Sequence, residues 1–146
     1  MITIKKYAAI DIGSNAMRLL ISNIVEQKDK ETQFNKSALI RVPIRLGQDA
    51  FTVGEISDEN IDRMIDAMKA FKLLMKVYKV EKYKACATSA MREAYNGKEV
   101  AEIIKAKAEI DIEIIDGKNE AAIIASSDLH SFLKTDQTYL YVDVGG

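Results

Sequence analysis

The sequence is poor in the residues that cross-link a chain or hold a soft metal. Among its 146 residues there is one cysteine, Cys86, and one histidine, His130. A single cysteine excludes an internal disulfide, and a single histidine leaves no basis for a histidine metal site or a Ser-His-Asp triad. Cys86 stands in the short apolar stretch KACAT, and we expect it to be a packed core thiol.

The sequence also lacks long apolar runs and an excess of charge of either sign. No stretch of 18 apolar residues occurs, and the chain opens without a signal-peptide pattern, so we expect a cytoplasmic protein with no membrane partner. Lys and Arg total 21, and Asp and Glu total 22. This balance gives no general attraction to DNA, so any anionic ligand must be held by a local site.

Three strand-like stretches open a chain that is otherwise typical of a globular domain, with 48% apolar and 29% charged residues. Residues 7–11 and 17–25 are apolar and β-rich, and apolar side chains alternate with polar ones through residues 38–46. Pro43 cannot donate to a β ladder, so the third strand should lie at a sheet edge or carry a bulge.

Helical periodicity follows the three strands. Ser57 is placed to cap a helix through residues 61–78, and Asn96 is placed to cap a later one. The elements predicted after the first helix are a strand at 84–88, helical segments at 89–95 and 98–109, a strand at 112–115, a helix at 119–130 and a strand at 138–144.

The order βββαβαβα, then a final strand, predicts an α/β fold with a mixed five-stranded sheet and helices on both faces. We expect residues 1–131 to form a first domain. Residues 132–146 would then be a linker and the first strand of a truncated second domain.

Two similar phrases stand near the ends of the chain, YAAIDIGS from residue 7 and YLYVDVGG from residue 139. Each ends an apolar strand with aspartate and then glycine. Glycine lets the backbone turn sharply and approach a ligand, and successive N–H groups in such a turn form an anion site. One such turn alone is most often only a turn, but two of them favour a cleft that holds a polyphosphate with its metal.

Four stretches in order, AAIDIGSNAMRLLI, ATSAMREA, IIDGKNEAAII and YVDVGG, resemble the exopolyphosphatase/guanosine pentaphosphate phosphohydrolase (Ppx/GppA) family. This family belongs to the actin-like ATPase superfamily, so the resemblance implies a ribonuclease H-like fold. It also implies a hydrolase that releases terminal phosphate from inorganic polyphosphate, from guanosine pentaphosphate, or from both, with Mg²⁺.

The resemblance implies a role for particular residues. Glu120 would be the general base that orients the attacking water, and Asp143 would help to bind Mg²⁺. Arg92 would hold the phosphates of the substrate. The full phosphate-binding set implied is Asp11, Gly13, Ser14, Asn15, Arg92, Gly145 and Gly146.

The sequence departs from the family at two places. Ala16 stands where the family usually has serine, and the chain stops within the second phosphate loop at Gly146. We therefore expect the first domain of a longer protein, inactive by itself. A homodimer of the longer protein is left open.

Without the resemblance, three of the proposed site residues also have a simpler structural explanation. Glu120 could interact favourably with the dipole of its helix, Arg92 could be a surface cation, and Asp11 could cap its turn. Two other functions stay open: a sugar kinase or ATPase of the same superfamily, and a non-catalytic module that binds an alarmone or polyphosphate. The sequence does not choose between polyphosphate and pentaphosphate.

Overall fold

The computed structural model describes residues 2–126, which form a mixed five-stranded sheet with the strand order β3-β2-β1-β4-β5. The first three strands make an antiparallel meander, β4 pairs in parallel with β1, and β5 pairs in parallel with β4. This arrangement confirms the predicted α/β fold. The strands are β1 (Ile2–Ile12), β2 (Ala16–Gln27), β3 (Gln33–Pro43), β4 (Lys82–Ala87) and β5 (Ile112–Ile114).

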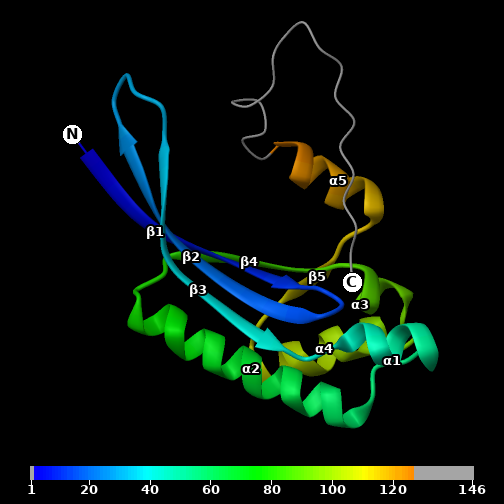
Figure 1. The fold of residues 1–146 in the computed structure, drawn as a ribbon. Coiled ribbons are helices and arrows are strands. Elements are labelled where there is room, and N and C mark those ends of the chain that lie inside the picture. Colours follow the sequence, from blue (N-terminus) through cyan, green and yellow to red (C-terminus); the bar gives the residue numbers. More distant parts are fainter. Residues whose placement is uncertain (1, 127–146) are drawn as a thin grey trace, which may run out of the picture.

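The helices lie on the two sides of this sheet (Figure 1). Helices α2 and α4 pack along one face, and α5 lies on the opposite side. The helices are α1 (Leu46–Thr52), α2 (Asp58–Val77), α3 (Ser89–Glu93), α4 (Gly97–Ala108) and α5 (Gly117–Ser126). In the part of the chain that the structure describes, no helix combines the length and apolar character needed to cross a bilayer.

The core lies between the sheet and helices α2 and α4. Alternate residues of β1, such as Ile10 and Ile12, are buried, and so is every turn of one face of α2. Phe71, at the middle of that face, is 1% exposed. Full burial of a side chain of this size contributes about 1.5–3 kcal/mol, so the helical periodicity read from residues 61–78 reflects a real packing face.

The third strand ends earlier than predicted. It stops at Pro43, and Leu46 begins the short helix α1 instead of continuing the alternation. Arg45 adopts a left-handed conformation with φ of 62°, which turns the chain into α1. The backbone N–H groups of Ile44 and Arg45 both bind the carbonyl of Asn15, so a tertiary contact redirects this segment.

Asn96 stands at the start of α4, as predicted, but its side chain does not cap that helix. Its Nδ2 donates to the carbonyl of Ile56 at 2.8 Å, and its Oδ1 accepts from the N–H of Ile56 at 2.9 Å. The side-chain amide of Asn96 therefore makes a two-point hydrogen bond to the backbone of Ile56, just before α2. It joins the α3–α4 turn to the α1–α2 loop.

Cys86 is not the packed core thiol that we expected. It is half-buried and lies on the face of β4 opposite the buried Ala85 and Ala87. The strand register places it between Asp11 of β1 and Glu113 of β5. Burial raises the pKa of the Cys86 thiol, the Lys84 ammonium lowers it less, and these two carboxylates raise it further, so the thiol stays protonated.

The start of α2 is fixed by a carboxylate from α1. Ser57 caps the helix by accepting from the N–H of Asn60, as predicted. Asp49 in turn accepts from the Ser57 N–H at 3.0 Å, the Ser57 hydroxyl at 2.6 Å and the Asn60 amide at 2.8 Å. Burial raises the pKa of Asp49, but these three hydrogen bonds together outweigh it and hold the pKa below its ordinary value.

We expect Asp49→Asn to flatten the pH dependence of stability. Because the folded-state pKa is depressed, the ionised carboxylate stabilises the fold above its unfolded pKa, and this contribution is lost as the pH falls through the folded value. Denaturant unfolding of the parent should lose free energy between about pH 5 and pH 3, and the variant should lose less. Asp66→Asn, on the exposed side of α2, is the control, and an equal slope in the parent and Asp49→Asn would contradict the prediction.

Candidate active site

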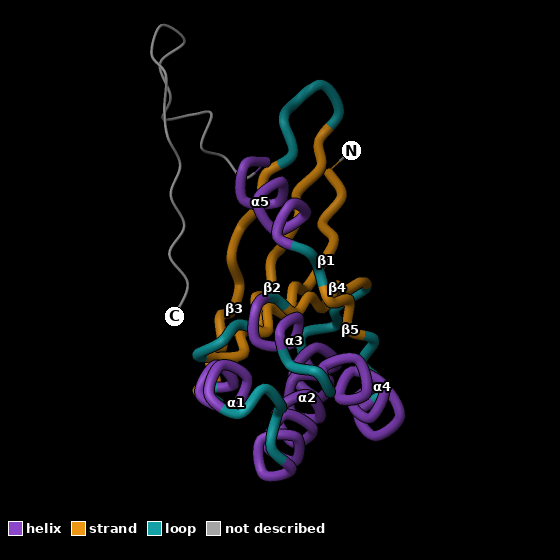
Figure 2. Tube along the Cα trace, turned by 90° about the vertical axis from the view of Figure 1, so that its right-hand side faces the viewer, coloured by secondary structure: helices purple, strands orange, loops and turns teal. Residues whose placement is uncertain are grey.

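The carboxyl ends of the three parallel strands β1, β4 and β5 meet at one edge of the sheet. The N–H of Thr88, after β4, binds the carbonyl of Ile12 at 3.1 Å, and the N–H of Ile115, after β5, binds the carbonyl of Ala87 at 3.0 Å. Figure 2 looks onto this edge, with α3 in the middle and α1 and α4 on either side. Open α/β sheets bind their ligands outside the carboxyl ends of the strands, so this edge is where a site is expected.

The tip of the β1–β2 hairpin, residues 13–15, stands at this edge and is held by its carbonyl groups. The Ser14 carbonyl accepts from the N–H of Gly47 at 2.8 Å, and the Asn15 carbonyl accepts from two N–H groups at the start of α1. Among residues 2–126, the N–H groups of Ser14 and Asn15 bind no acceptor. Two adjacent N–H donors in a turn, with no partner in the protein, can together bind an anion.

Gly47 is what allows α1 to approach the hairpin tip so closely. A Cβ atom at this position would lie 3.0 Å from the Cβ of Ser14 and 3.0 Å from the ring of Phe51. A glycine avoids both contacts. The short helix that the sequence did not reveal is therefore part of the support of the first loop.

Arg92 and Glu120 meet at the same edge, although they lie 28 residues apart in sequence. The Nη1 of Arg92 donates to the Ile115 carbonyl at 2.9 Å and lies 3.3 Å from Oε2 of Glu120. Both side chains are less than one third exposed. A weaker contact of 3.4 Å joins Nε of Arg92 to the more exposed Glu93.

Glu120 is placed by the turn that begins α5. The predicted turn at Asp116 is present, and Asp116 Oδ1 accepts from the N–H of Asn119 at 2.8 Å. The N–H of Glu120 binds the Asp116 carbonyl at 2.9 Å, which puts Glu120 in the first turn of the helix. The helix starts at Gly117, two residues before the predicted start.

Asp11 lies beside the hairpin tip and forms an ion pair with Arg18, a residue that the sequence reading did not single out. The two stand directly opposite each other in the β1–β2 register. The signal was available, because a two-residue turn at Ser14 and Asn15 pairs position 11 with position 18. The arginine neutralises a carboxylate that would otherwise repel an anion at the loop.

The second predicted loop, Asp143, Gly145 and Gly146, lies outside the described residues, as does His130. The predicted meeting of the two loops stays a prediction. Within residues 2–126 no three Asp, Glu, His or Cys side chains come together in a way that would hold a metal ion. These residues therefore do not fit a Mg²⁺ site of their own.

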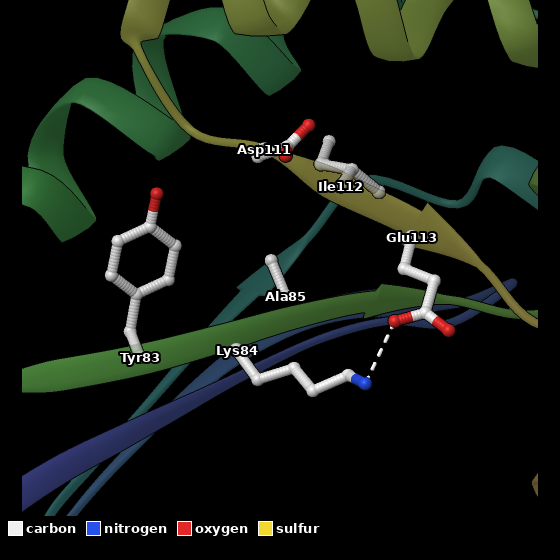
Figure 3. A pocket seen from close by; sticks show the side chains of 6 residues that line it. All are labelled: Tyr83, Lys84, Ala85, Asp111, Ile112 and Glu113. Carbon is white, nitrogen blue, oxygen red and sulfur yellow. Dashed lines mark ion pairs between the residues drawn. The ribbon is translucent and has the colours of Figure 1, made fainter.

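Two hollows differ in what they offer a ligand. One of about 470 Å³ adjoins Arg92 and Asp116, with Tyr95 and Lys98 also in its wall. The other, of about 680 Å³, lies toward the amino ends of β4 and β5, and Figure 3 shows its charged side chains. There the Lys84 ammonium forms an ion pair with Glu113 at 2.7 Å, so it already has an anionic partner within the protein. The hollow beside Arg92 is the one that adjoins the candidate site.

The comparison with known families decides which family this chain belongs to. The sequence profile of the Ppx/GppA phosphatase family matches residues 21–146. The chain belongs to this family. The predicted resemblance is therefore confirmed. A bifunctional 3-dehydroquinate synthase/phosphatase of Fusobacterium nucleatum is 32% identical to this chain over 143 residues.

Family members also share the fold. The Ppx/GppA family member of Aquifex aeolicus superposes with a TM-score of 0.73 at 31% identity, over 81% of this chain and 37% of that one. An exopolyphosphatase from Cytophaga hutchinsonii gives a TM-score of 0.70 at 29% identity, over 82% of this chain and 36% of that one. An actin-like ATPase type of fold, as predicted, fits these matches.

The curated relatives are much longer than this chain. The Fusobacterium protein matches 95% of this chain but only 21% of its own length. A guanosine-5'-triphosphate,3'-diphosphate pyrophosphatase of Photobacterium profundum is 29% identical over 96% of this chain and 27% of its own length. The chain thus spans about a fifth to a quarter of these Ppx/GppA relatives.

Proposed function

We propose that this Ppx/GppA chain is the first domain of a phosphohydrolase that releases terminal phosphate from inorganic polyphosphate or guanosine pentaphosphate. The observation that supports this most is the meeting of Arg92 and Glu120 at the sheet edge that carries the hairpin tip. A permanent cation, a carboxylate and free N–H donors stand there together. These are the groups that phosphoryl transfer to water requires.

Arg92 would bind the phosphate that is to be released. Its guanidinium is planar and permanently charged, which suits a two-point contact with phosphate oxygens. The Ile115 carbonyl holds one nitrogen at 2.9 Å, so the side chain keeps its place when a phosphate replaces Glu120 as its ionic partner. The two N–H groups of the hairpin tip would neutralise a further phosphate oxygen.

Glu120 would then act as the general base. Once phosphate replaces Glu120 as the ionic partner of Arg92, the Glu120 carboxylate is free to accept a proton from the water that attacks in line. General-base catalysis of this kind contributes about 10²–10⁴-fold to the rate. Mg²⁺, for which we propose Asp143 as a ligand, would supply further neutralisation of the phosphate oxygens.

The names of the relatives favour hydrolysis over transfer to a sugar. One is a guanosine-5'-triphosphate,3'-diphosphate pyrophosphatase and another an exopolyphosphatase, which supports both substrates proposed here. Both substrates are soluble anions. With no excess positive charge in the chain, we propose a cytoplasmic enzyme without a DNA partner.

Binding of inorganic tripolyphosphate to this chain tests the proposal. Arg92→Lys should raise the Kd by about tenfold, because lysine keeps the charge but not the two-point contact or the bond to Ile115. Arg41→Lys, on the edge strand β3, is the matched control and should leave the Kd unchanged. Titration calorimetry measures both, and no binding by the parent chain, or equal affinity in Arg92→Lys, would contradict the proposal.

A further inference from the structure

Ser14 and Ser89 form a hydroxyl pair that joins the first loop to α3. Their Oγ atoms lie 2.8 Å apart, across 75 residues of sequence. Ser14 is only 7% exposed, whereas Ser89 is half-buried. The contact crosses from the end of β1 to the end of β4, the two strands that meet at the candidate site.

The chemistry of such a pair leaves one proton over. Each hydroxyl carries one donor, and the hydrogen bond between them uses only one of the two. The remaining proton can be donated elsewhere. Since Ser89 is the more exposed member, a ligand at this edge reaches its hydroxyl more readily than that of Ser14.

Ser89 also stands in line with Arg92. Both belong to α3, and residues three apart share one face of a helix. Ser89 contacts the hairpin tip through Ser14, and Arg92 contacts Glu120. Two polar contacts therefore lie along the edge, one between the loop and the start of α3 and one between α3 and the carboxylate on α5.

We propose that Ser89 is a substrate-binding residue, whose hydroxyl accepts a hydrogen bond from Ser14 and donates its own proton to a non-bridging phosphate oxygen. In this arrangement Ser14 contributes its backbone N–H to the anion, and its side chain orients Ser89. The substrate phosphates lie between the hairpin tip and Arg92. The inference rests on the proposed function, because it names a further contact of the same site.

The experiment measures binding of inorganic tripolyphosphate to the 146-residue chain by titration calorimetry. Ser89→Ala should raise the Kd by about tenfold, the range for a hydrogen bond to a charged group. Ser89→Thr keeps the hydroxyl and should restore the affinity. Ser14→Ala should weaken binding less than Ser89→Ala, because Ser89 keeps its own proton. Ser22→Ala, in the middle of β2 opposite Tyr7, is the matched control.

The outcomes separate the two proposals. If the parent chain does not bind tripolyphosphate, the proposed function fails with this inference. If the parent binds but Ser89→Ala matches Ser22→Ala, only the role of Ser89 is wrong. A larger loss in Ser14→Ala than in Ser89→Ala also overturns it, since Ser14 would then be the contact. Thermal unfolding checks the fold of each variant. If Ser89→Ala lowers the Tm, and Ser89→Thr keeps the Tm of the parent but not its affinity, the hydroxyl has only a structural role.

Discussion

Glu120→Gln is expected to lower kcat for phosphate release by at least two orders of magnitude in the full-length phosphohydrolase proposed above. Glutamine keeps the size of the side chain and its position in the first turn of α5, but it cannot accept a proton from water at neutral pH. Binding of tripolyphosphate should change little, because phosphate contacts Arg92 and the hairpin tip instead. The loss should therefore be in kcat and not in Kd.

Glu93→Gln is a matched control, because Glu93 also contacts Arg92, through Nε at 3.4 Å. It is 59% exposed, against 29% for Glu120. An exposed ion pair contributes little, so kcat should stay within about threefold of the parent. If both variants lose activity equally, Glu120 serves only as an ionic partner of Arg92. Full activity in Glu120→Gln would remove the carboxylate from the mechanism.

The order of strands and helices could be predicted because each element carries its own signal. The apolar character of the strands follows from local sequence, and so does the apolar face of α2. The fold then follows from the few topologies that a meander and alternating α/β units allow. These signals are short in range, and they fail where a distant contact decides the local conformation.

Helix α1 is the clearest such failure. Its seven residues are too few to be stable alone, and the alternation through Leu46 favoured a strand. What decides the conformation is the Asn15 carbonyl, which binds the N–H groups of Ile44 and Arg45 from across the site. No feature of residues 38–46 by itself announces that partner.

The residues of the candidate site likewise divide into those with a sequence signal and those that only the fold brings together. Arg92 and Glu120 came from motifs, and their side chains meet because β4 and β5 are neighbours in the sheet. Ser89 was overlooked, since a lone serine at a helix start reads as an ordinary helix-start residue. Its partner Ser14 is 75 residues away, and only the parallel pairing of β1 with β4 brings the two hydroxyls together.

Gly97→Ala is expected to destabilise the domain by about 1–3 kcal/mol, as overpacking against fixed backbone does. Gly97 begins α4, and a Cβ atom there would lie 1.9 Å from the carbonyl oxygen of Met91. That atom is backbone and cannot rotate away. Relief by moving α4 would pull Asn96 from Ile56 and so release the α1–α2 loop.

The expected loss of stability in Gly97→Ala is opposite in sign to the usual effect of this substitution. Replacing glycine by alanine in a helix ordinarily stabilises a protein, by about 0.4–1 kcal/mol. Gly117→Ala is the matched control, because Gly117 begins α5 and has no atom within 4 Å of its built Cβ. Urea unfolding followed by circular dichroism should show the midpoint falling in Gly97→Ala and holding or rising in Gly117→Ala. Equal midpoints in the two variants would mean that the α3–α4 turn relaxes at little cost, and that the Asn96 contact does not fix it.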